Sequence, residues 1–65
     1  MFIRVNAERL EVDEQTTVVT LLQLLGYPDR GIAVAVDQAV LPRSAWATTL
    51  SDGAELEVVT AVQGG

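Results

Sequence analysis

The chain has 65 residues, of which 49% are apolar, and its formal net charge is −5, with no Cys and no His. This length predicts one small domain with a packed core, and the missing residue types exclude disulfides, cysteine metal sites and histidine general-base chemistry. The four cations are scattered arginines that form no basic stripe, which argues against nucleic-acid binding. No segment is apolar and long enough for a membrane or patterned as a signal peptide, so we expect a cytoplasmic protein that is not an enzyme.

The N-terminal segment alternates between apolar and polar residues, which predicts a β-hairpin. The first strand covers residues 1–6 and the second covers residues 9–12, each with one apolar face. The connection through Asn6 and Ala7 is short, and alanine tolerates the positive φ of such turns poorly.

Residues 17–25 change to helical periodicity, with apolar residues at positions i, i+3, i+4 and i+7. Thr17 is suited to cap the start of this helix, Gly26 is suited to end it, and Pro28 prevents its continuation. Residues 16–20 contain β-branched side chains of low helix propensity, but the apolar spacing outweighs this weak preference.

The second half of the chain predicts three further strands. Residues 32–36 form a nearly apolar central strand, and residues 40–41 form a short return strand after a turn over residues 37–39. Residues 43–50 are irregular or form one helical turn, and residues 55–62 form the last strand.

This order of elements implies an α+β fold in which a mixed sheet of four to five strands packs on one helix. It is also the order of the β-grasp, or ubiquitin-like, fold. We expect a β-grasp domain over residues 1–62 and a flexible tail over residues 63–65. The expected core residues lie on the apolar faces of these elements: Ile3, Val5, Leu10, Val12, Val18, Leu21, Leu22, Leu25, Ile32, Val34, Val36, Trp46, Leu50, Leu56 and Val58.

Two glycines, Gly64 and Gly65, end the chain directly after the last predicted strand. A chance pair at this place has odds of about 0.5%, given average glycine usage. A frayed, inert end is the alternative interpretation. The position of the pair after a ubiquitin-like order of elements favours a functional tail.

Several short stretches of the sequence together are specific enough to indicate a protein family, although each alone is a weak signal. They are Thr17-Val18 with Leu21-Leu22, Ala33 to Asp37, Val40 to Arg43 with Trp46, Leu50, Asp52-Gly53, and Glu57 to Gly65. In these stretches the chain resembles the ThiS family, the sulfur carriers of thiamine biosynthesis, over essentially its whole length. It departs from the family pattern at Asp37, where Asn is common, at Gln63, where a small residue is common, and at Asn6-Ala7 in place of Asn-Gly.

The resemblance implies that the α-carboxylate of Gly65 is the reactive group. A ThiF-type adenylating enzyme would use ATP and Mg²⁺ to convert this anion, a poor electrophile, into an acyl adenylate with loss of pyrophosphate. Sulfur from a persulfide protein would then produce a thiocarboxylate for a ThiG-type thiazole synthase. Gly64 and Gly65 lack Cβ atoms and therefore suit a narrow channel. The carrier itself is expected to bind no cofactor.

The outer face of the sheet is the predicted docking surface. In a β-grasp fold the first, last and third strands lie side by side, and here their outward positions are unusually apolar, which marks an interface. The predicted partner-binding residues lie on this face, with one more in the tail: Phe2, Ala33, Ala35, Val59, Ala61 and Gln63. Asp37 and Asp52 are expected to bond local backbone in turns, and no metal site is expected.

Three alternative functions stay open at this stage. A MoaD-like carrier would keep the chemistry and serve molybdopterin or another thio-compound, but residues 60–63 lack the proline typical of that type. A β-grasp binding module would have an inert tail. A protein modifier would join its C-terminus to lysines of other proteins, although this chain has no Lys of its own.

Two further side chains could have either a structural or a binding role. Trp46 is expected to fill the core rather than to anchor a partner. Arg43 is expected to be a solvated charge rather than a partner contact.

Overall fold

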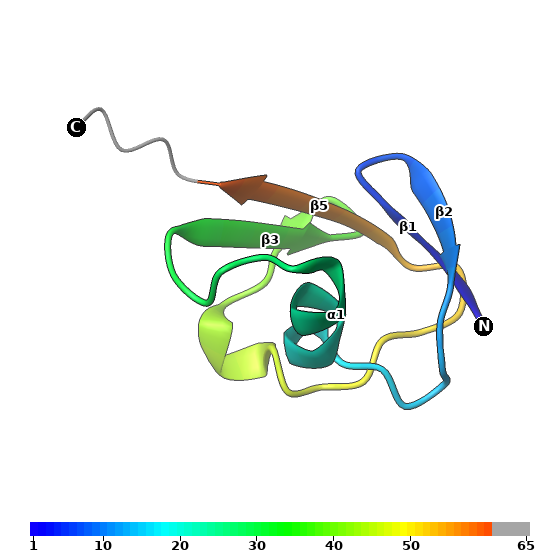
Figure 1. The fold of residues 1–65 in the computed structure, drawn as a ribbon. Coiled ribbons are helices and arrows are strands. Elements are labelled where there is room, and N and C mark those ends of the chain that lie inside the picture. Colours follow the sequence, from blue (N-terminus) through cyan, green and yellow to red (C-terminus); the bar gives the residue numbers. More distant parts are fainter. Residues whose placement is uncertain (61–65) are drawn as a thin grey trace.

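The computed structural model describes residues 1–60, in which one helix packs against one face of a sheet (Figure 1). The elements in chain order are β1 (Phe2–Val5), β2 (Glu8–Glu11), α1 (Val18–Leu25), β3 (Ile32–Val36), β4 (Ala39–Val40), a 3₁₀ turn (Arg43–Ala45) and β5 (Glu55–Thr60). Within residues 1–60, five strands form one sheet in the order β2-β1-β5-β3-β4. β1 and β5 run parallel and all other neighbours run antiparallel. The predicted α+β fold of the β-grasp type is therefore confirmed.

Both hairpins of the sheet use two-residue turns with a left-handed backbone. The φ angles are 51° at Asn6 and 71° at Ala7 in the first turn, and 49° at Asp37 and 72° at Gln38 in the second. Turns of this kind match the twist of the strands that they join. Because each turn uses only two residues, β2 and β4 each lie one residue nearer the N-terminus than predicted.

The helix α1 is held at both ends by hydrogen bonds that its sequence supplies. Thr17 is the predicted N-cap and forms a reciprocal pair with Thr20, whose backbone N–H donates to Thr17 Oγ1 (3.2 Å) and whose Oγ1 accepts from the Thr17 N–H (2.9 Å). The cap thus uses one of the β-branched residues that lower helix propensity. Gly26 ends the helix at a φ of 82°, as predicted. Within residues 1–60, no helix is long and apolar enough to cross a membrane.

The core lies between α1 and the inner face of the sheet. Most of the predicted core residues are buried, namely Ile3, Val5, Val12, Val18, Leu21, Leu22, Val34, Trp46, Leu56 and Val58, and Leu10, Ile32, Val36 and Leu50 pack against them half-buried. The prediction for Leu25 is wrong, because α1 ends at this residue and the core covers only its first two turns, which leaves Leu25 38% exposed. Ala54 is buried without having been predicted, since it lies just before β5 and its carbonyl accepts from the Arg4 N–H.

Ala7→Gly should stabilise the fold. A left-handed backbone costs a residue with a Cβ about 1–2 kcal/mol, and part of this gain is offset by the freedom that glycine adds to the unfolded chain. We expect the free energy of unfolding to rise by about 0.5–1 kcal/mol and the Tm to rise by several degrees in thermal unfolding. Ala45→Gly, at a position without positive φ, is the matched control and should lower the Tm. Equal shifts in both variants would contradict the prediction.

Candidate functional site

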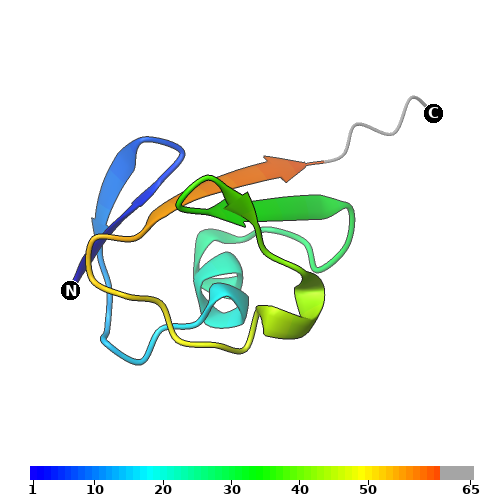
Figure 2. The same cartoon turned by 180° about the vertical axis from the view of Figure 1, so that it is seen from behind.

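The strand that leads to the predicted reactive end is the central strand of the sheet. β5 lies between β1 and β3, as both views of the ribbon show (Figure 1, Figure 2). Several sequence predictions fall outside the described residues. They are the tail residues Gly64 and Gly65, the partner residues Ala61 and Gln63, and the domain boundary after residue 62. The described part of the site is therefore β5 and the residues that hold and flank it.

The two neighbours of β5 hold it over different lengths. On one side β3 pairs with β5 from Leu56, opposite Val36, to Thr60, opposite Ile32. On the other side β1 pairs with only the first two residues of β5, up to Val5 opposite Leu56. Beyond that point the backbone of β1 turns away into the hairpin.

The side chain of Asn6 continues the hydrogen bonding where β1 stops. The Asn6 backbone N–H still donates to the Leu56 carbonyl (2.9 Å). Its side-chain Oδ1 accepts from the Val58 N–H (2.9 Å), and its Nδ2 donates to the Val58 carbonyl (3.3 Å). The amide thus bonds both backbone groups of Val58, as a strand residue would. Nδ2 also donates to Tyr27 Oη (3.4 Å), a contact that no pattern in the sequence predicts.

The first residue of the other hairpin turn bonds the opposite end of β5. Asp37 donates its backbone N–H to the Glu55 carbonyl (2.7 Å), and its Oδ1 accepts from the Glu55 N–H (3.0 Å). Asp52 Oδ1 accepts from the Phe2 N–H (2.8 Å). The prediction that these two carboxylates bond local backbone is wrong, because the fold brings a distant strand beside each turn. Among residues 1–60, no group of three or more acidic, His or Cys side chains could hold a metal ion.

An apolar patch lies on the outer face of the sheet near the end of β5. Ala33 pairs with Val59, and Ala35 lies opposite Val40 in the next strand. Val59 is 62% exposed and Val40 is 77% exposed. We call these four residues the tail-side patch. Val40 was not among the predicted partner residues, although its hairpin pairing with Ala35 places it on the same face.

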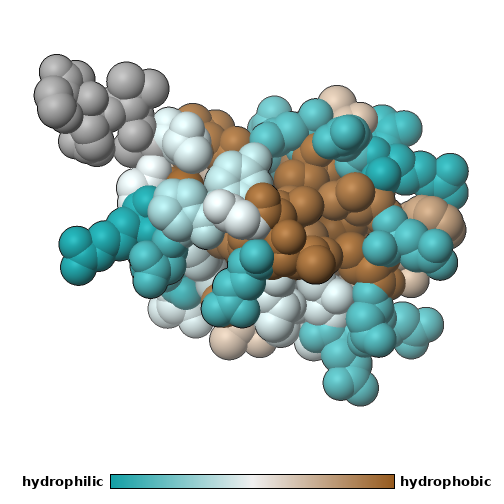
Figure 3. Space-filling view, in the orientation of Figure 1, coloured by the Kyte–Doolittle hydropathy of each residue, from teal (hydrophilic) through white to brown (hydrophobic). Residues whose placement is uncertain are grey.

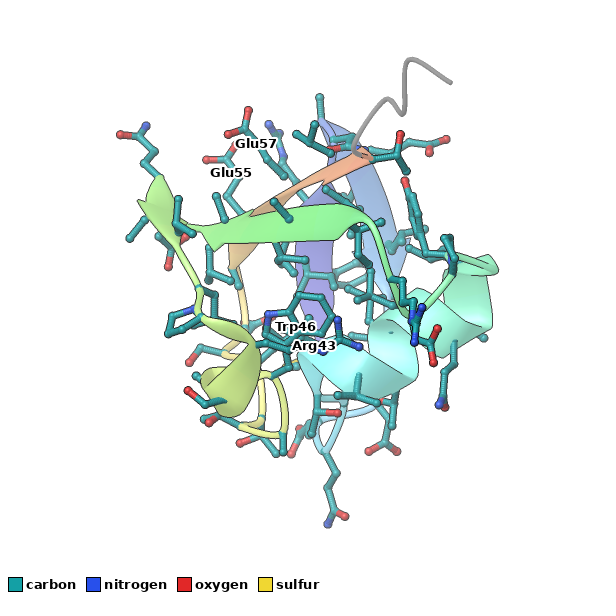
Figure 4. The ribbon with its side chains drawn as sticks, turned by 90° about the vertical axis from the view of Figure 1, so that its left-hand side faces the viewer. Arg43, Trp46, Glu55 and Glu57 are labelled. Atoms are coloured by element: carbon teal, nitrogen blue, oxygen red, sulfur yellow. The ribbon has the colours of Figure 1, made fainter. Side chains whose placement is uncertain are left out.

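Carboxylates flank the tail-side patch. Glu57 lies opposite Ala35, and Glu55 lies two residues earlier on the same strand. Figure 4 shows both carboxylates projecting from the face of the sheet that points away from Arg43 and Trp46. Arg4 contacts Glu55 at 3.9 Å in an exposed ion pair, which contributes little to stability.

Phe2, the remaining predicted partner residue, lies at the other end of this face. Its carbonyl accepts from the Gly53 N–H (2.7 Å), so it lies level with the residues before β5. Six residues separate that position from Val59, which is about 20 Å along a strand. The guanidinium of Arg9 lies 4.0 Å from the ring centroid, and 41% of Phe2 is exposed. The structure therefore does not join Phe2 to the tail-side patch.

A second apolar surface lies on the helix side of the molecule. Figure 3 shows a hydrophobic area between α1 and the β1–β2 hairpin. Three apolar residues of α1 itself are also exposed: Val19, which lies beside Arg43 and Trp46, Leu25, and Leu24 at 72%. These residues lie on the opposite side of the sheet from the tail-side patch, because α1 packs on the inner face (Figure 1).

Trp46 is a core residue, as predicted. Only 6% of it is exposed, and its Nε1–H donates to the Leu41 carbonyl (3.1 Å). Arg43 is exposed, but its guanidinium lies 5.0 Å from the indole and donates to the Asp29 carbonyl, so it is held by contacts within the protein (Figure 4). Together with Tyr27 and neighbouring residues, these side chains line a hollow of about 200 Å³ beside α1.

Trp46→Phe should destabilise the protein without unfolding it. The phenyl ring keeps most of the packing but cannot donate to the half-buried Leu41 carbonyl, and an acceptor left without its partner costs about 1 kcal/mol or more. Urea denaturation should give this loss in the free energy of unfolding. Arg43→Gln is the control: it removes the exposed stacking contact with Trp46 and the exposed hydrogen bond to the Asp29 carbonyl, and should cost about 1 kcal/mol. An unchanged free energy in Trp46→Phe would show that the indole hydrogen bond is not structural.

Comparisons with known proteins agree with this architecture. A family model described as the ThiS family matches residues 3–65. The crystal structure of a thiamine biosynthesis protein (ThiS) from Geobacter metallireducens matches with a TM-score of 0.81 at 30% identity, over 100% of both chains. An NMR structure of a thiamine biosynthesis protein from the same organism gives 0.77 at 30% identity, over 100% of this chain and 88% of that one.

A more distantly related structure shares the fold. A ubiquitin-like protein from the hyperthermophilic archaeon Caldiarchaeum subterraneum matches with a TM-score of 0.50 at 16% identity, over 97% of this chain and 96% of that one. At this identity the likeness shows the fold alone. Among curated proteins, none matches the sequence.

Proposed function

Because this chain belongs to the ThiS family, we propose that it is a sulfur carrier protein that supplies sulfur for the thiazole of thiamine. The observation that carries the proposal is the family match over residues 3–65, which includes Gly64 and Gly65. The solved structures that it resembles at 30% identity are described as thiamine biosynthesis proteins, which favours this pathway over a MoaD-like role in molybdopterin synthesis.

The proposed chemistry begins at the α-carboxylate of Gly65. In a ThiF-type enzyme, with ATP and Mg²⁺, a carboxylate oxygen attacks the α-phosphorus and pyrophosphate leaves, which makes the acyl carbon electrophilic. The terminal sulfur of a persulfide protein then attacks that carbon, and AMP leaves. A second thiol attacks the donor's own sulfur and forms a disulfide with it, which breaks the bond between the donor and the transferred sulfur. The product is a thiocarboxylate, a sulfur nucleophile that a ThiG-type synthase consumes.

The carrier contributes binding and presentation to this reaction. The chain has no Cys and no His, so it has neither a thiol to hold a persulfide nor an imidazole to act as a general base. Its partners supply ATP activation, sulfur and acceptor, and the carrier supplies a surface and a tail. We therefore propose a β-grasp domain over residues 1–62 that is not an enzyme, with residues 63–65 as the reactive tail.

We propose the tail-side patch as the docking surface for the activating enzyme. Val59 lies six residues before Gly65, so an enzyme that binds this patch holds the chain close to the reacting carboxylate. Ala33 and Ala35 are small and leave room for side chains of the partner. Glu55 and Glu57 beside the patch favour a basic partner surface and orient its approach. Ala61 and Gln63 stay predicted contacts nearer the reactive end.

Deletion of Gly65 should abolish sulfur loading and leave the fold intact. All of the proposed chemistry takes place on one terminal carboxylate, and the described core is complete by Thr60. We would incubate the wild-type chain and the deletion variant with a ThiF-type enzyme, ATP and a sulfur source, and record intact masses. Only the wild type should gain the mass that replaces one oxygen by sulfur. A wild type that never gains this mass would favour the inert binding module, and loading of the deletion variant at the normal rate would exclude Gly65 as the reactive residue.

Val59→Asp should weaken binding to the activating enzyme at least tenfold, or about 1.4 kcal/mol. The substitution places a carboxylate in the middle of the tail-side patch, where the partner would bury it without a counter-charge. Leu24→Asp is the matched control, because it makes the same change of charge at a similarly exposed residue on the helix side. Both variants should keep the wild-type far-UV spectrum. Equal affinities of the two variants for the enzyme would place the docking surface elsewhere.

A further inference from the structure

We infer that Asn6 is a positioning residue for the reactive tail, because its side chain holds the end of β5 at the place where β1 no longer can. The inference rests on the proposed function, since it concerns how the Gly65 carboxylate is presented. Asn6 lies 59 residues from Gly65 in the sequence. The fold brings it to Val58, the residue directly before Val59 of the tail-side patch.

The contact needs both a donor and an acceptor on one side chain. Val58 presents its N–H and its carbonyl toward the side of β5 that β1 has left, and the Asn6 amide bonds both, at 2.9 Å and 3.3 Å. A carboxylate at this position could accept from the N–H but would face the carbonyl with a second acceptor. The left-handed backbone of Asn6, with a φ of 51°, is one that Asn adopts at little cost.

Asp37 provides a comparison within the same fold. It occupies the same place in the other hairpin turn, with a φ of 49°, and bonds Glu55 of the same strand. There the backbone N–H of Asp37 supplies the donor, so its side chain needs only to accept. Asn6 therefore supplies the side-chain donor and acceptor needed at Val58, and Asp37 supplies the side-chain acceptor needed at Glu55. The end from which the tail continues is the one held by a side-chain donor as well as an acceptor.

This contact fixes the position of Val58 on the side of β5 that β1 has left. From Val58 onward β5 is paired on one side with β3, and Asn6 supplies the hydrogen bonds on the other. Without them the end of the strand could shift in the plane of the sheet while three of the four residues of the tail-side patch stayed in place. A displacement of Val58 and Val59 would change where an enzyme bound to the tail-side patch meets the chain, and the rate depends strongly on the position of the reacting atom.

The test separates docking from presentation. Asn6→Asp keeps the turn and the acceptor but removes the donor, and Asn6→Gly keeps the turn and removes the whole amide. Asp37→Asn is the matched control, because it retains an accepting oxygen in the other turn. We would measure affinity for the activating enzyme directly, thiocarboxylate formation at saturating enzyme by intact mass, and amide exchange at Val58 and Val59 by NMR.

Both Asn6 variants should keep the affinity within about twofold and lose about tenfold in the saturating rate. Amide exchange at the end of β5 should become faster in both. Asp37→Asn should keep the wild-type values of affinity and rate. The Asn6 variants should thus lose rate and keep affinity for the enzyme, whereas Val59→Asp should lose affinity.

A further variant distinguishes positioning from plain loss of stability. Val12→Ala lowers stability by a cavity in the core, away from β5, and should keep the wild-type saturating rate while the protein stays folded. Wild-type rates in both Asn6 variants, or an equal loss of rate in Val12→Ala, would overturn the inference. Absence of thiocarboxylate on the wild-type chain would instead overturn the proposed function, and this role with it.

Discussion

The insertion of β5 between β1 and β3 is the arrangement on which the rest of the structure depends. β5 runs parallel to β1 and antiparallel to β3, and so joins two separate hairpins into one sheet. Its inward residues Leu56 and Val58 are buried against the core beneath α1. Without this strand the helix would have two unconnected hairpins to cover, and a chain this small has little other apolar surface to bury.

The same strand connects the stable part of the molecule to the proposed chemistry. The central strand of a sheet has hydrogen-bonded neighbours on both sides, and here the two hairpin turns add bonds through Asn6 and Asp37. Val59 and Glu57 lie on its outward face, where we propose the docking surface. Under the proposed function, one strand therefore supplies part of the docking surface and also leads to the reacting carboxylate.

Much of the fold could be predicted from periodicity alone, because helix and strand patterns depend on residues that lie only a few positions apart in the sequence. The order of elements, the caps of α1 and most core residues follow from such patterns. Apart from Leu25 at the end of α1, the misses concern pairing across the sheet. Val40 joined the tail-side patch and Phe2 lay apart from it. Asp37 and Asp52 bonded β5 and β1 rather than local backbone, through strand registers that a single sequence does not encode locally.

The parallel pairing of β1 with β5 also has a consequence for how the protein is made. β1 pairs with β2 directly after it in the chain, but Arg4 lies opposite Glu55, so β1 meets its parallel neighbour only after 51 further residues have been synthesised. Contacts between such distant segments form late and slowly in folding. The sheet can close only once β5 is available, which means that the proposed docking surface and the strand leading to the tail are completed in the same step. Under the proposed function, a chain without β5 would present neither one to an activating enzyme.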